Sequence, residues 1–544
     1  MKSTTSKSNR RSKLYTLIAA LAVIAIVVAA GVVYGVYRWS STSSGSNAST
    51  AVTSTHTPTP SQESAPVSPS ASKDVILIAF QTNWRSVAAE CTKTYGPEGV
   101  GYVEVSPPQE SIQGSQWWTS YQPASYRLDS KLGSESDFTN MVSTCKAAGV
   151  GIIADAVINH MAGAYSGGGE RQGVSGSPYT ADGSFPAVPY SKENFHTCTS
   201  NIMNYGNASD VQNCRLDALQ DLDTSQPYVQ DKISDYLKHL LDLGVYGFRV
   251  DAVKHIANAD VAAIKTRLAQ KTGRPAQDIF FEQEVIGSPS EAKEIQPSVY
   301  LGNGKVSEFR YSSSLAKMFA DDIADEDTGL KSIGGKYWLP TSKAAVWVTN
   351  WDTERDRALT YKSGPSYLLA NAFMLAYDYG QPHVYSGYYF ATKDDGAPGA
   401  TATSVPDASC PTDGSMQPGT WQCAQRWTAI RGMIGFRKAV SGQKVRDWKR
   451  YGQNVLGFSR GSAGYLALNN SSKPSQQTFR SSLPAGEYCN VYASGDCSQT
   501  IKVSRDGSFQ ATLPAHSAIA LHTSASKSTW KGTQSSDPSD PRLG

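Results

Sequence analysis

The sequence lacks a strong excess of charge of either sign. Its 544 residues include 50 Lys and Arg against 47 Asp and Glu, a net charge of +3. Six of these cations lie in residues 1–13 and at Arg38 with no acid beside them, so the rest of the chain carries −3. A faintly acidic body has no basic stripe to displace counterions from a phosphate backbone, and we therefore expect no nucleic-acid partner.

The chain also has no internal repeat and no CxxC pair of the kind typical of zinc or redox sites. At 40% hydrophobic and 10% aromatic residues, it is neither disordered throughout nor collagen-like. Its cysteines are even in number, which in an exported chain favours disulfide bonds, but their spacing leaves roughly a hundred pairings open. The eight are Cys91, Cys145, Cys198, Cys214, Cys410, Cys423, Cys489 and Cys497.

Export is predicted by one apolar run near the N-terminus. Residues 14–37 carry no charge, and 24 helical residues would span about 36 Å, enough for a hydrocarbon core of about 30 Å. A cleavable signal peptide has a shorter apolar centre, so we predict a transmembrane signal anchor over 14–38. The basic residues precede it, which places 1–13 in the cytoplasm and the rest outside. The alternative is a long signal peptide cut near Ala29, with secretion.

Residues 39–72 follow as a Ser/Thr/Pro-rich linker that buries too little apolar surface to fold. Residues 525–544, rich in Ser, Lys, Thr, Gly and Pro, are expected to form a loose tail. The folded body therefore lies between these two segments.

Eight short apolar segments recur between residues 73 and 435. Helical spacing of apolar residues separates them, for example at 229–243 and 260–270. This alternation predicts an α/β fold in which a parallel sheet is buried on both faces, and eight units predict a (β/α)8 TIM barrel over 73–159 and 222–443. The expected strands are 75–80, 101–106, 151–157, 246–250, 279–281, 305–311, 345–349 and 383–385.

The gap at residues 160–221 is too long for an ordinary βα loop, so we predict a small inserted domain after the third strand. From residue 444 the pattern changes to brief β-like runs separated by turn residues. It predicts a C-terminal antiparallel β-sandwich domain over 444–524. Its expected strands are 455–458, 465–467, 485–492, 501–503 and 519–522.

Charged residues end several of the predicted barrel strands. In a barrel these strand ends meet at one mouth, where burying several carboxylates together is costly and has no value for stability. A pair of carboxylates in such a cleft is what glycoside hydrolysis requires, because one protonates the leaving oxygen while the other attacks the anomeric carbon. The strand-end residues are Asp155, Arg249, Asp251, Glu284 and Asp352, and the aromatic residues Trp117, Trp118 and Tyr121 could stack on sugar rings.

Four ordered motifs resemble the α-amylases of glycoside hydrolase family 13, in particular the animal and actinobacterial type. They are Asp-Ala-Val-Ile-Asn-His at 155–160, Gly-Phe-Arg-Val-Asp-Ala-Val-Lys-His at 247–255, Phe-Glu-Gln-Glu-Val-Ile at 281–286 and Val-Thr-Asn-Trp-Asp-Thr-Glu-Arg at 348–355. The similarity extends over about residues 75–523.

The resemblance implies a role for each matching position. Asp251 would be the nucleophile, Glu284 the general acid and base, and Asp352 the residue that binds sugar hydroxyls in the transition state. Arg249 would keep Asp251 ionised. The implied substrate-binding residues are Trp117, Trp118, Tyr121, Gln122, His160, Arg249, Lys254, His255 and Trp351.

The resemblance also implies a structural calcium ion and four disulfide bonds. Side chains of Asn159 and Asp221 and backbone carbonyls of Gln212 and His255 would bind the ion, and oxygen donors suit a hard cation. As an alternative, Asn159 and Asp221 would be turn residues only. The implied disulfide pairs are sequential: Cys91–Cys145, Cys198–Cys214, Cys410–Cys423 and Cys489–Cys497.

Two positions depart from the family pattern. Trp351 stands where most members have a histidine, and an indole offers one donor and no acceptor to a sugar. His383 stands where chloride-dependent members have a second arginine, and we expect a neutral histidine there to leave too little positive charge to bind chloride.

The resulting prediction is a monomeric cell-surface enzyme that hydrolyses internal α-1,4-glucosidic bonds in starch, glycogen and related α-glucans with retention. Three alternatives stay open. One is a transglycosylase or a maltooligosaccharide-acting enzyme of the same family, another is a catalytically silent amylase-like surface subunit, and a third is a starch-binding adhesin.

Overall fold

The computed structural model describes residues 72–533, 540 and 541, apart from residues 167 and 357. The predicted cytoplasmic segment (1–13), the membrane anchor (14–38) and nearly all of the linker (39–72) lie outside these residues. Among the helices that are described, none has the length and apolar character that crossing a bilayer requires.

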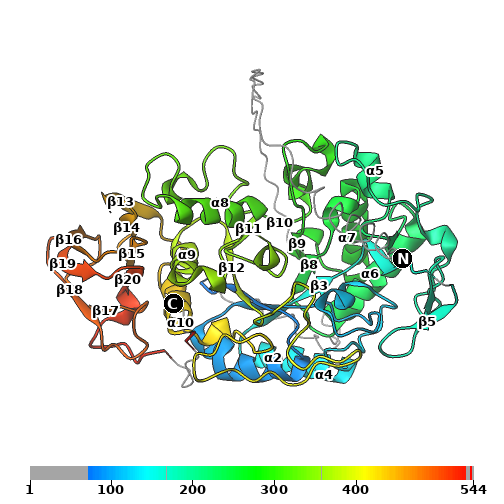
Figure 1. Ribbon diagram of the computed structural model, residues 1–544, viewed down its shortest axis with the longest axis horizontal. Coiled ribbons are helices and arrows are strands. Elements are labelled where there is room, and N and C mark those ends of the chain that lie inside the picture. Colours follow the sequence, from blue (N-terminus) through cyan, green and yellow to red (C-terminus); the bar gives the residue numbers. More distant parts are fainter. Residues whose placement is uncertain (1–71, 167, 357, 534–539, 542–544) are drawn as a thin grey trace, which may run out of the picture. The chain divides into compact units, whose positions relative to one another are not determined.

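Eight parallel strands close into a barrel (Figure 1). The ring is complete because β1 pairs with both β2 and β12. All eight predicted segments form strands, which confirms the (β/α)8 barrel. The strands are β1 (Ile76–Ala79), β2 (Tyr102–Val105), β3 (Gly151–Ala156), β8 (Gly247–Val250), β9 (Phe280–Gln283), β10 (Lys305–Ser307), β11 (Ala344–Trp347) and β12 (Gln381–Ser386).

One predicted strand, 305–311, is partly helical. β10 ends at Ser307, and α8 (Phe309–Ala320) begins two residues later. The buried positions of α8 recur every three or four residues instead of alternating, which favours a helix over a longer strand.

Helices pack around the barrel strands, as Figure 1 shows. The two helical patterns noted in the sequence correspond to α6 (Pro227–Asp242) and α7 (Asn258–Thr272). α4 begins at a capping box in which Ser134 and Asp137 exchange hydrogen bonds. The other long helices are α2 (Trp84–Glu90), α4 (Glu135–Ala147), α9 (Pro365–Ala376) and α10 (Thr428–Ala439).

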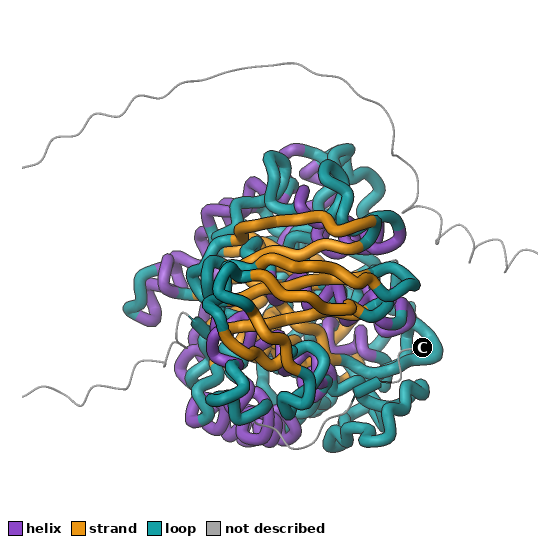
Figure 2. The backbone as a smooth tube through the Cα atoms, turned by 90° about the vertical axis from the view of Figure 1, so that its left-hand side faces the viewer, coloured by secondary structure: helices purple, strands orange, loops and turns teal. Residues whose placement is uncertain are grey.

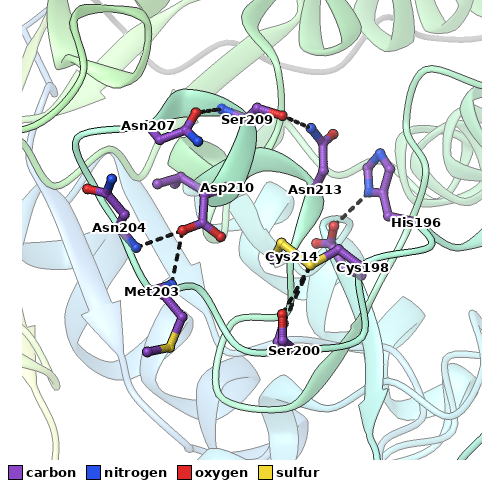
Figure 3. The surroundings of a disulfide bond; sticks show 12 residues. His196, Cys198, Ser200, Met203, Asn204, Asn207, Ser209, Asp210, Asn213 and Cys214 are labelled. Atoms are coloured by element: carbon purple, nitrogen blue, oxygen red, sulfur yellow. Dashed lines mark hydrogen bonds and ion pairs between the residues drawn. A yellow bond between two sulfur atoms is a disulfide. The ribbon is translucent and has the colours of Figure 1, made fainter.

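Residues 160–221, between β3 and α6, form a small irregular insertion. Its two ends are joined, because β4 (His160–Gly163) pairs with β7 (Leu219–Asp221) and sets His160 opposite Asp221. A second hairpin consists of β5 (Glu170–Gln172) and β6 (Pro178–Thr180), and α5 (Ala208–Asn213) follows. The disulfide bond Cys198–Cys214 lies beside α5 (Figure 3).

The C-terminal part is all-β, as predicted, and its strands face the viewer in Figure 2. A four-stranded antiparallel sheet is accompanied by two antiparallel pairs, and a separate apolar cluster that includes Phe479 and Phe509 lies among them. The sheet is formed by β13 (Val445–Gly452), β14 (Val455–Arg460), β15 (Gly464–Asn469) and β20 (Ser517–His522), and the pairs are β16 (Ser475–Arg480) with β19 (Ser508–Leu513) and β17 (Gly486–Cys489) with β18 (Thr500–Val503).

Three strands of the C-terminal part, β13, β16 and β19, were not predicted from the sequence. Each has polar or charged residues at many positions and an exposed face, so none resembles an apolar run. Backbone pairing to a neighbouring strand holds them in the sheet, and this partner is not visible in their own sequence.

The four disulfide bonds implied by the family resemblance are confirmed: Cys91–Cys145, Cys198–Cys214, Cys410–Cys423 and Cys489–Cys497. No free cysteine remains among the described residues.

The segment after residue 525 differs from the loose tail that we expected. Lys527 Nζ lies 2.8 Å from a carboxylate oxygen of Glu487, and Trp530 packs against the main apolar core. Farther along, Asp540 accepts a hydrogen bond of 2.6 Å from the backbone N–H of Thr428. The described part of this segment is therefore bound to the folded body.

A glycine permits close contact between α10 and the C-terminal domain. A methyl group on Gly432 would overlap the backbone carbonyl oxygen of Val491, whereas Gly435, one turn later in the same helix, has nothing within 4 Å of the position a methyl group would take. Only the first glycine is therefore required by packing.

We predict that Gly432→Ala destabilises the protein by about 1–3 kcal/mol or more, because α10 must move away from Val491. Gly435→Ala is the matched control and should be stabilising by up to about 1 kcal/mol, since alanine favours a helix. Chemical denaturation of the two variants measures both effects. Equal stabilities would show that α10 tolerates a shift at this contact.

Candidate active site

One guanidinium joins three of the carboxylates that end barrel strands. Arg249 Nη1 lies 2.8 Å from Asp155 and 2.7 Å from Asp251, and its Nη2 lies 3.0 Å from Glu284. The Arg249 side chain is only 4% exposed, so these contacts are made in a medium that screens charge poorly. The structure thus brings together residues from the ends of β3, β8 and β9, as their place in the sequence predicted.

Glu284 has a second contact that orients it. Its Oε2 accepts a 2.8 Å hydrogen bond from the backbone N–H of Ala252, a residue in the left-handed region at φ +52°. Burial raises the pKa of Glu284, and the nearby Asp251 raises it further against the opposing effect of Arg249. A carboxyl group whose pKa is raised retains its proton nearer to neutral pH, as a general acid requires.

Asp352 approaches the same group from the loop after β11, at the start of the 3₁₀ helix Thr353–Arg355. Burial raises its pKa to about 7, and the neighbouring carboxylates Glu284 and Asp251 contribute to the increase. Four carboxyl groups therefore surround the single guanidinium of Arg249, and they cannot all be ionised at once at low cost.

Aromatic rings pack behind this charged group. The ring of Trp351 lies 4.8 Å from the guanidinium carbon of Arg249, 5.2 Å from the parallel ring of Phe80 and 5.9 Å from Tyr121. Trp351 is 3% exposed. Its indole therefore shields Arg249 from water, a role that its sequence position did not indicate.

His160 connects Tyr121 to the insertion. Burial lowers the pKa of His160 to about 4, so the ring is neutral at pH 7. Its Nε2 lies 3.0 Å from the carbonyl oxygen of Tyr121 and must donate there, which leaves Nδ1 to accept from Asn159 Nδ2 at 3.3 Å. One tautomer thus satisfies both contacts.

The other residues implied as substrate-binding are spread around this group. Lys254 Nζ pairs with Glu291 at 2.7 Å, and His255 Nδ1 lies 3.1 Å from the carbonyl oxygen of Val211. Gln122 Oε1 accepts a 3.0 Å hydrogen bond from the backbone N–H of Gly163 in the insertion. The remaining two, Trp117 and Trp118, are half-buried in the 3₁₀ helix Trp117–Tyr121.

The oxygen donors expected for calcium lie at the base of the insertion. Asn159 Oδ1 is buried and has no hydrogen-bond partner among the described residues, and Asn159 Nδ2 lies 3.4 Å from Asp221 Oδ1. Burial raises the pKa of Asp221 to about 6. A buried amide oxygen without a partner beside a carboxylate fits a hard cation. The side chain of Gln212 donates to the Tyr300 hydroxyl at 3.3 Å, so this residue would contribute only its backbone carbonyl.

A second buried cluster was not predicted. Glu104, Glu282 and His383 project into the barrel, and their ligand atoms lie within 4.8 Å of one another. His383 Nε2 is 2.7 Å from Glu282, its Nδ1 is 3.1 Å from the carbonyl oxygen of Gln381, and Glu104 lies 4.0 Å away. Both ring nitrogens therefore face acceptors.

This cluster corrects one premise of the sequence analysis. Burial lowers the pKa of His383, but Glu282 and then Glu104 raise it, and the net pKa is raised. Because both ring nitrogens also face acceptors, the structure favours a protonated His383 over the neutral ring that we expected. The positive charge is matched by Glu282, whose pKa is lowered chiefly by His383 against the effect of burial. Glu104 is the extra acid, and burial followed by Glu282 raises its pKa to about 7.

A weak signal for this cluster exists in the sequence. Glu104 and Glu282 interrupt the apolar strands Tyr-Val-Glu-Val and Phe-Phe-Glu-Gln, and a charge inside such a strand points to a polar barrel interior. By contrast, nothing in the sequence marks Glu291 as the partner of Lys254.

Comparison with known proteins places this geometry in context. The model for the α-amylase catalytic domain matches residues 105–284, and the model for the α-amylase C-terminal all-β domain matches residues 446–524. An α-amylase of Streptomyces violaceus is 42% identical over 84% of this chain and 75% of its own length. The pancreatic α-amylase of Rattus norvegicus is 37% identical over 80% and 91%.

Solved structures are similar as well. The crystal structure of α-amylase I from Eisenia fetida has a TM-score of 0.76 and 30% identity, and the match covers 85% of this chain and 99% of that one. A glutamate-to-glutamine variant of the same protein, solved with maltohexaose, matches equally well at 31% identity.

We predict that His383→Gln destabilises the protein by about 3–5 kcal/mol, because Glu282 loses its buried cation. The charged His383 stabilises the fold fully below about pH 6.5, the ordinary pKa of histidine, and this stabilisation is lost as the pH rises through its raised pKa. The charged Glu282 stabilises the fold fully above about pH 4.3, and this stabilisation is lost as the pH falls through its lowered pKa. The loss should therefore be largest near pH 5–6 in a denaturation series. The double variant Glu282→Gln/His383→Gln should recover most of it, since a neutral amide pair remains. A double variant no more stable than the single one would contradict the pairing.

Proposed function

This chain belongs to glycoside hydrolase family 13 and is an α-amylase that acts on α-glucans, and from this premise we propose that it hydrolyses internal α-1,4-glucosidic bonds with retention of configuration. The observation that carries the proposal is the contact of Asp251 and Glu284 with one buried guanidinium. Starch, glycogen and related polymers are the proposed substrates.

In the first step, Asp251 attacks the anomeric carbon while Glu284 gives its proton to the departing glycosidic oxygen. The bond to the leaving chain breaks and a bond to Asp251 forms, so one sugar chain leaves with a new hydroxyl group. In the second step, Glu284 takes a proton from water, the oxygen attacks the same carbon, and Asp251 is released. Two inversions give net retention.

The contact of both carboxylates with one guanidinium supports retention over inversion. Retaining enzymes hold their pair about 5–5.5 Å apart, whereas inverting enzymes leave about 6.5–9.5 Å for a water molecule. Arg249 contacts Asp251 and Glu284 through neighbouring nitrogens of one planar group, which favours the closer arrangement. Asp352 is proposed to bind sugar hydroxyls as charge develops on the ring.

The surroundings of the carboxylates support a polymeric substrate. We assign sugar contacts to Trp117, Trp118, Tyr121, Gln122, His160, Lys254 and His255, with Trp351 acting from behind Arg249. A cavity of about 270 Å³ begins at Val285, next to Glu284, and its lining includes Trp338 and Tyr337. Tyr337 is 79% exposed, so its ring is available to a glucan chain that extends past the cleaved bond.

A structural calcium ion is proposed for the base of the insertion. Asn159, Asp221 and the backbone carbonyls of Gln212 and His255 would hold it, and it would fix the insertion against the barrel without taking part in the reaction. Chloride is not proposed, because the carboxylates of Glu282 and Glu104 next to His383 would repel an anion.

The proposed location is extracellular, with residues 14–38 as a membrane anchor and 39–72 as a stalk, and secretion after cleavage as the alternative. Four disulfide bonds support an oxidising compartment. We propose that the enzyme acts as a monomer.

We predict that Glu284→Gln lowers the rate of reducing-sugar release from soluble starch by about 10²–10⁴-fold, because an amide cannot supply the proton. Glucan binding and the melting temperature should stay close to those of the wild type. Glu326→Gln, at an exposed glutamate that pairs with Lys331, is the matched control and should leave activity unchanged.

The wild-type products distinguish the remaining alternatives. We expect amylose to shorten rapidly and the released sugars to be α-anomers. NMR of the products measures the anomeric form. Products of a single size would favour a maltooligosaccharide-acting enzyme, and longer chains built from short ones would favour a transglycosylase. No sugar release by the wild type would indicate a silent subunit and refute the proposed function.

We predict that chelation lowers the stability of the wild type by about 2.7 kcal/mol relative to calcium at 100 times its Kd. Calcium should restore the melting temperature, whereas magnesium should not, since the smaller ion dehydrates reluctantly. Asp221→Asn should be less stable and insensitive to the chelator. A wild type that melts at the same temperature with and without chelator would remove the calcium site.

A further inference from the structure

Lys131 is a buried lysine without a carboxylate partner. Its side chain lies in the loop before α4 and is 2% exposed. In the part of the chain that the structure describes, no carboxylate oxygen lies within 4.0 Å of its nitrogen. A buried ammonium normally pairs with an acid, so the position calls for an explanation.

The three N–H groups of Lys131 find three oxygens of one turn. Nζ lies 2.8 Å from the carbonyl oxygen of Gln116, 2.8 Å from Thr119 Oγ1 and 3.4 Å from the carbonyl oxygen of Gly114. The hydroxyl of Thr119 in turn donates to Gln116 O at 2.7 Å. An ammonium has three donors and no acceptor, so its hydrogen-bonding capacity matches this turn.

The turn includes the first residues of the 3₁₀ helix Trp117–Tyr121, and this helix runs toward the active site. At the far end of that helix, Tyr121 packs 5.9 Å from Trp351, whose ring covers Arg249. Near its start, Trp117 Nε1 donates to the carbonyl oxygen of Lys393 at 2.8 Å. Lys131 therefore anchors the end of the helix that lies away from the catalytic carboxylates.

We propose that Lys131 is a positioning residue for glucan binding: its ammonium holds the 114–119 turn and thereby orients the segment that carries Trp117 and Trp118. The inference rests on the proposed function, since it assigns those rings to the substrate. Lys131 itself touches no reacting atom.

A consequence is that the turn responds to pH. Burial lowers the pKa of Lys131 to about 7. Above that pH the neutral amine has two N–H groups and one lone pair, so it can donate to only two of the three oxygens. The lone pair then faces a carbonyl oxygen, or the Thr119 hydroxyl turns to donate to it and gives up its bond to Gln116 O. In both cases the turn loses a hydrogen bond.

The charged groups nearest to Lys131 are engaged elsewhere. Asp129 accepts a hydrogen bond from Glu135 N at 3.1 Å, and Asp137 accepts from Ser134 at the start of α4. On the other side, Asp407 pairs with Arg85 at 3.2 Å. Asp129 and Asp137 line the same cavity as Lys131, as does Arg85, the partner of Asp407.

The test measures binding of maltohexaose by tryptophan fluorescence in the Glu284→Gln background, where cleavage does not contribute. Adding Lys131→Met should weaken binding about tenfold at pH 6, as expected when one charged hydrogen-bond donor is lost. Between pH 6 and 8.5 the Kd of the parent should rise with a midpoint near pH 7. Asp352 and Glu104 titrate in the same range in both proteins, so the measure is the ratio of the variant Kd to the parent Kd, which should fall from about tenfold at pH 6 as Lys131 loses its proton.

Lys473→Met, at an exposed lysine of the C-terminal domain, is the matched control and should follow the parent. If Lys131→Met does not fold, Thr119→Val removes one acceptor and should weaken binding about threefold in the same direction. An unchanged Kd and pH profile in the Lys131→Met variant, with starch still hydrolysed by the wild type, overturns the inference alone. A lower melting temperature with unchanged binding also overturns it, because the role would then be structural. Failure of the proposed function has a different signature, a wild type that releases no sugar.

Discussion

The buried guanidinium of Arg249 is the interaction on which the active site depends. It contacts Asp155, Asp251 and Glu284 within 3.0 Å, and it is the nearest cation to all three. Without it, several carboxylates would lie together in a weakly screening interior, which is costly. The strands β3, β8 and β9 therefore converge on one cation, and their spacing around the barrel sets the distance between Asp251 and Glu284.

Buried carboxylates that need a cation or a proton also lie deeper inside the barrel. A layer of Glu104, Glu282 and His383 replaces part of the apolar filling expected of a TIM barrel. His383 compensates Glu282, and Glu104 is left to hold a proton near neutral pH. Arg249 and His383 thus lie among six acids, which cannot all be ionised at low cost.

Much of this architecture was predictable because it depends on local pattern. Apolar runs marked all eight barrel strands, and acids at their ends marked the site, since a strand end in a parallel barrel has only one mouth to face. Polar strands such as β13 and β16 escaped prediction, because their pairing depends on distant neighbours. The burial of Trp351 against Arg249 was also beyond the sequence, because it depends on a contact between β8 and the loop after β11.

The fold class and the residues at the strand ends followed from the sequence, and the four disulfide pairs followed from the family resemblance. The pairing of the buried charges became visible only in the folded chain. The pairing of His383 with Glu282, the unpartnered Asn159 Oδ1 and the three oxygens around Lys131 join segments that are far apart or have no shared motif. The physical reason is that an electrostatic interaction depends on distance and burial, and neither quantity is encoded in the neighbouring residues of the chain.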